Sequence, residues 1–363
     1  MDSIIGNNTW VLTDLPLGCK SLGCKWIFKK KMKVNGIVEK FKSRLVIQGF
    51  RQKSRINYFN TYALVARIST IRLLIALALI HNLIIHQIDV KTTFLNDELN
   101  EEVLYEGHGE ADVIIGIRIK HESNRITISQ SHYIEKVLKE FNYFECSLVS
   151  TPMDTSEKLM PNNGQVVSQL EYSRVIGCLM YAMTYIMPDI AFVVGKLSTY
   201  TSNPGTQHWQ AIQRVLKYLK KIIDYSLTYT GYPSVLEGYI DASWISNAED
   251  ELSTSGWVFL LDGGTISWAF KKQTCITGLI MKFEFVALAA AGKEAEWLRN
   301  LILEIPLWSK PITHISIRCN SVATLAMAYS QMYNGKSRHL GVRHNMICEL
   351  IMNRVVFIEF VMS

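Results

Sequence analysis

The order of strand-like and helix-like segments from residue 236 onward places the strongest limit on the fold. Three expected strands come first, followed by a long helix, a strand, two helices and a last strand: 236–241, 256–261, 265–268, 282–304, 314–319, 321–330, 343–352 and 355–361. Asp262-Gly263-Gly264 is a turn signal between the second and third strands. Such an order predicts a mixed sheet flanked by helices.

The residues before 236 predict smaller units. Asn35-Gly36 is a strong hairpin signal between strands within 24–50, and Ser123-Asn124 divides two strands within 111–130. We expect a strand at 86–90 that ends in an acidic residue. Five helices are also expected, at 69–85, 131–142, 169–184, 188–201 and 206–222. The longest apolar run, 73–85, is too short and too interrupted to span a bilayer, so no membrane partner is expected.

The charge of the chain is concentrated near its beginning. Hydrophobic residues make up 48% and charged residues 19%, which is typical of a globular protein. The net charge is +6, yet residues 1–70 carry 13 Lys/Arg against 3 Asp/Glu. Such a basic block can follow a phosphate backbone, and the alternative is a solvated basic hairpin. No signal peptide is recognisable and the seven cysteines are scattered, so we expect a cytoplasmic or nuclear protein that is not secreted.

Many ordered segments resemble the reverse transcriptase and ribonuclease H part of plant-type copia LTR retrotransposon polyproteins. The first part of the resemblance lies at 26–29, 40–46, 48–52, 87–96 and 101–103. The second part lies at 181–183, 188–190, 208–220, 253–256, 266–273, 293–298 and 336–340. The resemblance implies an α+β and α/β multidomain chain. Its expected parts are a fingers and palm remnant (1–130), a helical connection (131–230) and a ribonuclease H-like domain with a mixed five-stranded sheet (231–363).

The resemblance also implies RNA-directed DNA synthesis as the ancestral activity. That chemistry uses two metal ions, Mg²⁺ in this family, held by carboxylates on adjacent palm elements. Asp89 matches the first of these carboxylates, whereas the Tyr-x-Asp-Asp hairpin has no counterpart, because the chain contains no Asp-Asp pair. A palm segment is missing between Glu106 and Ala111. We therefore predict no polymerase activity and only weak Mg²⁺ binding by Asp89, which is alternatively an ordinary strand-end residue.

Cleavage of RNA–DNA hybrids, the second ancestral activity, also requires a cluster of acids around two metal ions. Asp241 and Glu284 match the first two acids, and they are the predicted Mg²⁺ ligands. Asn320 stands at the position of the third acid, and the fourth is expected beyond Ser363. Lys282 replaces a residue that is usually acidic and would repel a cation. The alternative interpretation of Asp241 and Glu284 is a strand-end Asp and a helix-start Glu.

Three functions are compatible with these residues. The leading hypothesis is a degenerate and catalytically inactive reverse transcriptase and ribonuclease H protein. The second is a nucleic-acid-binding protein that contacts RNA, DNA or an RNA–DNA hybrid through basic residues. The expected contacts are Lys29, Lys30, Lys31, Lys42, Arg44, Arg51 and Lys53. The third is residual ribonuclease H activity that uses Asp241, Glu284 and a substrate phosphate. The sequence leaves the oligomeric state open.

Overall fold

A computed structural model describes residues 23–32, 38–47, 67–90, 105–154, 159–231, 235–243, 253–273, 280–306, 313–333, 335 and 337–362. The chain forms two compact units. One comprises residues 1–66 with 90–106, and the other comprises residues 67–89 with 107–363. The second unit contains residues from all three of the expected parts, and the three-part division stays a prediction.

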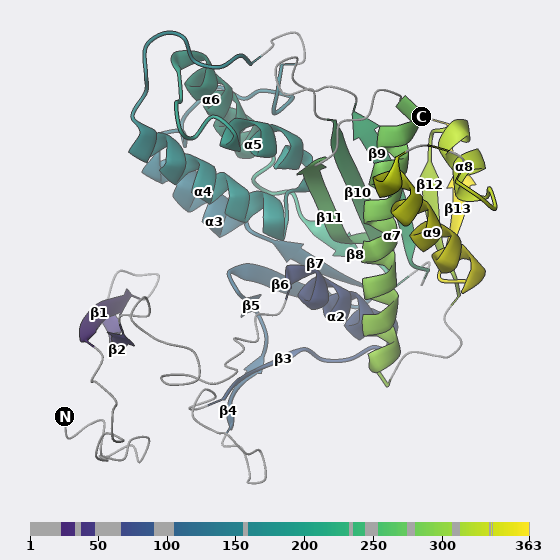
Figure 1. The fold of residues 1–363 in the computed structure, drawn as a ribbon. Helices are drawn as coiled ribbons and strands as arrows, with labels where there is room; N and C mark the ends of the chain where they lie inside the picture. Colours follow the sequence, from purple (N-terminus) through teal and green to yellow (C-terminus); the bar gives the residue numbers. More distant parts are fainter. Residues whose placement is uncertain are drawn as a thin grey trace, which may run out of the picture. The chain divides into compact units, whose positions relative to one another are not determined.

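A five-stranded sheet forms the centre of the second unit, with the strand order β11-β10-β9-β12-β13 (Figure 1). Its strands are β9 (Glu237–Ser243), β10 (Thr254–Leu261), β11 (Gly264–Lys272), β12 (Ile315–Cys319) and β13 (Val356–Phe360). The first three strands pair antiparallel, while β12 runs parallel to both β9 and β13. The mixed five-stranded sheet predicted from the order of the elements is thus confirmed.

Three helices accompany this sheet: α7 (Ile280–Glu304), α8 (Val322–Ala328) and α9 (Arg338–Met352). The long helix α7 packs against β9 and β10 and also against α9. At Gly292 of α7, an added Cβ would come within 2.8 Å of the Ile347 side chain, so the absence of a side chain permits this close helix contact. All three helices were expected, although α9 begins five residues earlier than the pattern indicated.

The preceding part of the second unit combines a four-stranded sheet with a group of helices. The strands are β5 (Val113–Ile114), β6 (Ile117–Glu122), β7 (Arg125–Ser129) and β8 (Leu227–Tyr229). The helices are α3 (Ser131–Glu140), α4 (Gln169–Tyr185), the short 3-10 helix η2 (Pro188–Ile190), α5 (Ala191–Ser198) and α6 (Thr206–Lys221). The hairpin between β6 and β7 confirms the turn predicted at 123–124. In contrast, β8 was not expected, and the helix expected at 188–201 is divided into η2 and α5.

Helix α2 (Ile68–Ile80) is shorter than predicted. It ends at a turn in which Asn82 has a φ of 51°, a conformation that asparagine tolerates better than most residues. The helix packs against β11 and β7. Strand β3 (His86–Val90) follows and pairs with β4 (Tyr105–Glu110). In the described ranges, no helix combines the length and apolar character needed to cross a membrane.

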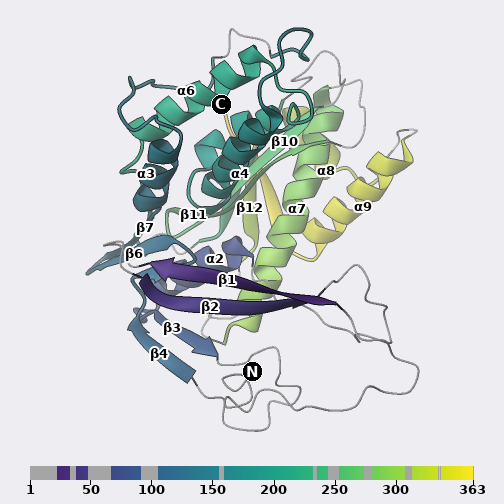
Figure 2. The same cartoon turned by 90° about the vertical axis from the view of Figure 1, so that its left-hand side faces the viewer.

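In the first unit, β1 (Cys24–Met32) pairs antiparallel with β2 (Val38–Ile47), as the sequence predicted (Figure 2). The register places Ile27 opposite Arg44 and Lys29 opposite Lys42. The Asn-Gly turn that prompted the prediction lies outside the described residues. Basic and apolar residues thus alternate along a two-stranded antiparallel ribbon.

Candidate acidic site

Asp241 lies near the end of β9, where it pairs with Gly256 of β10. Its side chain is exposed at this end of the central sheet. The strand places the carboxylate beside the beginning of α7, since β9 and α7 pack together. Asp241 thus lies two residues before the end of β9, and its neighbourhood follows from the packing of the long helix.

Glu284 occupies the beginning of α7 and is only 6% exposed. Burial raises the pKa of its carboxyl group to about 7, and the negative charge of Asp241 adds to the rise. The interaction shows that the structure brings together the two acids that the sequence paired. Among the described residues, Glu284 Oε2 has no hydrogen-bond partner. A buried acceptor of this kind favours a proton or a cation as its neighbour.

Asn320 follows directly after β12, and its side chain is exposed. The preceding Cys319 is buried, and burial raises the pKa of its thiol, with a smaller contribution from the charge of Glu284. The end of β12 thus lies beside Glu284, as expected for the third acid position. This position contributes an amide instead of a carboxylate.

A metal cluster needs more carboxylates than this site provides. Within the described part of the chain, no group of three or more His, Cys, Asp or Glu residues is arranged to hold a metal ion. Asp241 and the unpartnered oxygen of Glu284 could contact one divalent cation. Two ions, however, need several shared oxygens and compensating negative charge. The described residues therefore do not fit a two-metal cluster.

Gln273 supports the site, although sequence reasoning did not single it out. Its side chain is 4% exposed and donates from Nε2 to Ser255 Oγ at 2.9 Å and to the Phe283 carbonyl at 2.8 Å. Its backbone N–H also donates to the Ser253 carbonyl at 2.8 Å. These bonds join the beginning of β10 to the turn of α7 that carries Glu284. The sequence offered one signal for this role: Gln273 directly follows the two lysines that end β11.

The other predicted site residues are only partly described. Lys282 is half-buried near the beginning of α7. Asp89 lies in β3, but its side chain is outside the described part of the structure. The same holds for the side chains of Lys29, Lys31, Lys42 and Arg44, and Arg51 and Lys53 lie wholly outside the described residues. The polymerase site and most of the basic contacts therefore stay predictions.

In the β1–β2 hairpin, the described side chains include exposed basic and aromatic groups. Lys25 and Lys30 are exposed. The rings of Trp26 and Phe28 are also exposed, at 41% and 75%, and stack with their centroids 6.2 Å apart. Proteins that bind single-stranded nucleic acids combine basic side chains, which contact the phosphate backbone, with exposed aromatic rings, on which the bases stack.

Comparison with known proteins agrees with the resemblance seen in the sequence. Residues 7–108 match the family model described as reverse transcriptase (RNA-dependent DNA polymerase). The retrovirus-related Pol polyprotein from transposon TNT 1-94 of Nicotiana tabacum is 27% identical, over 97% of this chain and 34% of that protein. The Pol polyprotein from transposon RE2 of Arabidopsis thaliana is 24% identical, over 94% of this chain and 30% of that protein.

The chain thus spans about a third of the length of these curated relatives. The alignment with the first of them extends over 457 positions, which exceeds the 363 residues of this chain, so that relative contains segments without a counterpart here. Among solved structures, RNase H1 from the archaeon Halobacterium salinarum is 18% identical, over 35% of this chain and 86% of that protein, with a TM-score of 0.27.

Proposed function

Because the chain belongs to the copia-type Pol polyproteins of retrotransposons, we propose that it binds nucleic acid but neither synthesises DNA nor cleaves RNA–DNA hybrids. The proposed nucleic-acid partners are RNA, DNA and their hybrid. The ancestral activities of the family, DNA synthesis and hybrid cleavage, both depend on clusters of carboxylates and divalent cations. Each cluster is incomplete in this sequence.

The loss of polymerase activity is inferred from the missing palm segment. The reverse transcriptase match ends at residue 108, within the four-residue stretch that separates Glu106 from Ala111 in this chain. The longer alignment with the tobacco relative supports an internal loss. Without the Asp-Asp pair, Asp89 is the remaining acid of the polymerase set. One carboxylate supplies too few oxygens to hold Mg²⁺ firmly.

The loss of hybrid cleavage is inferred from the acidic site, and Glu284 carries the argument. Burial, together with the negative charge of Asp241, raises the pKa of the Glu284 carboxyl group to about 7. Protonation competes with metal binding, and Asn320 adds no negative charge to compensate. Metal ions, when bound in such sites, activate water and stabilise the leaving oxygen. Among the described residues, Asp241 and Glu284 are the two carboxylates of this site that remain as candidate metal ligands.

The exposed basic and aromatic side chains of the β1–β2 hairpin support the binding part of the proposal. Contacts to a phosphate backbone require positive charge and no catalytic acid, so binding can outlast catalysis. The competing hypothesis is residual cleavage, with Asp241, Glu284 and a substrate phosphate as the cation ligands. The unpartnered oxygen of Glu284 is the observation that favours this second candidate.

Cleavage of a labelled RNA–DNA hybrid in Mg²⁺ or Mn²⁺ tests the proposal. We expect the purified, folded protein to bind the hybrid without cleaving it. Asn320→Asp would return a carboxylate to the end of β12 and should raise Mn²⁺ affinity about tenfold, as measured by calorimetry, because carboxylates are preferred ligands of hard cations. Asn320→Ala serves as the control and should leave the affinity unchanged.

Glu284→Gln separates the two candidate functions. If the unmodified protein cleaves the hybrid and Glu284→Gln abolishes cleavage, the two remaining acids are active and the proposal of inactivity is wrong. If neither protein cleaves but both bind the hybrid with the same affinity, the binding function stands. Absence of hybrid binding by both folded proteins would contradict the proposal as a whole.

A further inference from the structure

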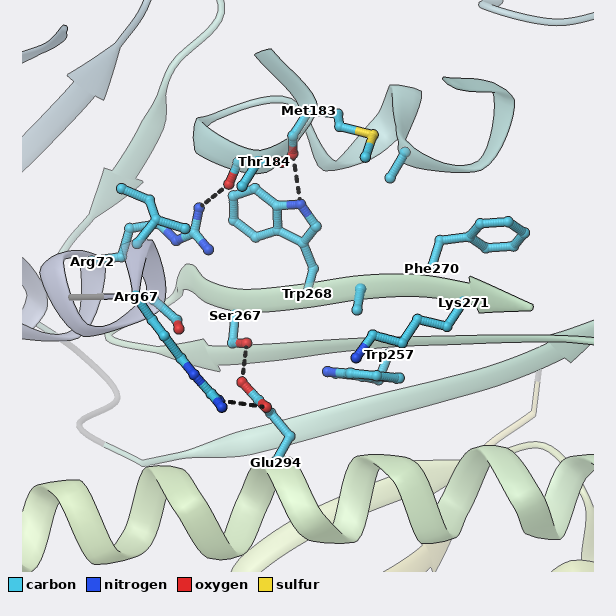
Figure 3. Close-up of a pocket in the computed structure, with 14 residues that line it drawn as sticks. Arg67, Arg72, Met183, Thr184, Trp257, Ser267, Trp268, Phe270, Lys271 and Glu294 are labelled. Carbon is cyan, nitrogen blue, oxygen red and sulfur yellow. Dashed lines mark hydrogen bonds and ion pairs between the residues drawn. The ribbon is translucent and has the colours of Figure 1, made fainter. Parts of the chain in front are cut away.

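A pocket of about 430 Å³ lies at the edge of the central sheet, around strand β11 (Figure 3). The first turn of α2, the end of α4 and the middle of α7 form its other walls. Among the strands that the structure describes, β11 is the last of its sheet. Neither Asp241 nor Glu284 lines the pocket, so it is distinct from the candidate acidic site.

Glu294 of α7 places a carboxylate in the pocket. Ser267 Oγ of β11 donates a hydrogen bond to Glu294 Oε1 at 2.7 Å, and Arg67 Nη1 lies 3.8 Å from Oε2. The Arg67 guanidinium also lies over the Trp297 ring, 4.6 Å from its centroid. The carboxylate is therefore held in a fixed position, and it can accept further hydrogen bonds because each oxygen has two lone pairs.

Trp257 of β10 provides a donor in the same pocket. The residue is 8% exposed, and among the described residues its Nε1–H has no hydrogen-bond partner. The Lys271 Nζ lies 5.2 Å from the centroid of the Trp257 ring. In Figure 3 the indole nitrogen of Trp257 lies on the side of the ring nearest Glu294. Leaving a buried N–H without a partner is unfavourable, so a ligand acceptor at this point would be favoured.

This combination restricts the chemistry of the ligand. Glu294 would repel a purely anionic ligand, while Arg67 and Lys271 would repel a metal cation. Trp268 and Phe270 add aromatic surface to the wall. A planar group with a donor and an acceptor along one edge, joined to a separate negative charge, matches all of these groups. The pocket volume is in the range of small-molecule sites.

We propose that this pocket binds a nucleotide whose base carries an exocyclic amino group. The amino group donates to Glu294, the adjacent ring nitrogen accepts from Trp257 Nε1–H, and the phosphate contacts Lys271. Cytosine has this edge, with its amino group beside an acceptor nitrogen. Uracil has a carbonyl and an N–H at the same two positions, so both contacts become repulsive. The inference does not depend on hybrid binding or on the acidic site.

Calorimetric titration of the full chain with the matched ligands cytidine and uridine 5′-monophosphate tests this inference. The buffer contains EDTA, which removes any contribution of divalent cations at Asp241 and Glu284. We expect the dissociation constant of cytidine 5′-monophosphate to be at least about tenfold lower than that of uridine 5′-monophosphate. This difference corresponds to one discriminating base contact. Equal affinity of the two nucleotides, or no binding of either, would overturn the proposal.

Three variants separate the contacts. Glu294→Gln keeps the oxygen that accepts from Ser267 and should remove the preference for cytidine, whereas Glu296→Gln, an exposed change on the same helix, should not. Lys271→Ala should weaken the nucleotide about tenfold but leave the nucleoside cytidine unaffected. Trp257→Phe should weaken binding because it removes the Nε1–H, and circular dichroism checks that the variant stays folded despite its smaller ring. A Trp257→Phe protein that binds normally would exclude the indole contact.

Discussion

Asp262 shows how strongly one residue can depart from what its sequence context suggests. It lies in the turn between β10 and β11 with a φ of 58°, and the turn itself was predicted. The side chain, however, is 0% exposed, and within the described part of the chain neither carboxylate oxygen has a hydrogen-bond partner. Burial raises the pKa of this carboxyl group to about 7.

The raised pKa predicts a pH-dependent loss of stability. Between the unfolded pKa near 3.8 and the folded pKa near 7, the native state binds more protons, so the unfolding free energy falls as pH rises through this window. Asp262→Asn keeps the left-handed backbone and removes the charge. We expect it to stabilise the protein by about 1–3 kcal/mol at pH 8 and by much less at pH 4. Urea denaturation at both pH values tests this, and an equal effect at both would contradict it.

At the scale of elements, Arg72 joins three segments that are distant in sequence. The guanidinium donates from Nε to the Ile266 carbonyl of β11 at 2.7 Å and from Nη1 to the Thr184 and Tyr185 carbonyls of α4 at 2.8 and 2.9 Å. It also lies 3.6 Å from the centroid of the Trp268 ring. Arg72 is 2% exposed, and burial lowers its pKa to about 10. Figure 3 shows the side chain between α2 and α4.

Arg72→Lys should therefore be costly although it preserves the charge. A lysine ammonium cannot reproduce the planar fork or the stacking on Trp268, so buried carbonyls lose their donors. We expect a loss of about 2–4 kcal/mol in the unfolding free energy, measured by denaturant titration. As the control, Arg125→Lys alters an exposed ion pair with Glu122 and should change stability by less than about 0.5 kcal/mol. Equal effects of the two substitutions would show that Arg72 acts only through its charge.

Across the whole molecule, positive charge is concentrated in the first 70 residues, most of which lie in the first compact unit. The remainder of the chain has a negative balance, since the total is only +6. This distribution supports nucleic-acid contacts by the β1–β2 hairpin and its neighbours. The strength of such contacts depends on the release of counterions from the phosphate backbone.

Salt dependence of binding tests this distribution. We expect the logarithm of the hybrid-binding constant to fall linearly with the logarithm of the salt concentration. Replacing Lys29, Lys31 and Lys42 by alanine one at a time should reduce the slope by about one for each lost phosphate contact. The control is Lys221→Ala at the end of α6, which should leave the slope unchanged. A slope insensitive to all three hairpin variants would contradict the predicted basic contacts.

Much of the local structure could be predicted because it depends on neighbours in the sequence. Turn signals predicted the β1–β2 and β6–β7 hairpins. The helix expected at 169–184 forms as α4, whose buried face includes residues at helical spacing: Tyr172, Val175, Ile176 and Leu179. One local prediction that failed is the end of α2, whose apolar pattern continues past Ile80. There a turn at His81 and Asn82 ends the helix, and the apolar residues 83–85 lie between this turn and β3.

Periodicity, turns and ordered motifs were enough to predict the order of the elements from residue 236 onward, the mixed character of the central sheet and the family. It also identified Asp241 and Glu284 as a pair. The folded chain was needed to see that Glu284 is buried with an oxygen that has no partner among the described residues, that Gln273 supports its helix, and that Arg72 reaches a carbonyl 194 residues away. Burial and long-range hydrogen bonds depend on which distant segments of the chain pack together, and local sequence patterns do not specify this packing.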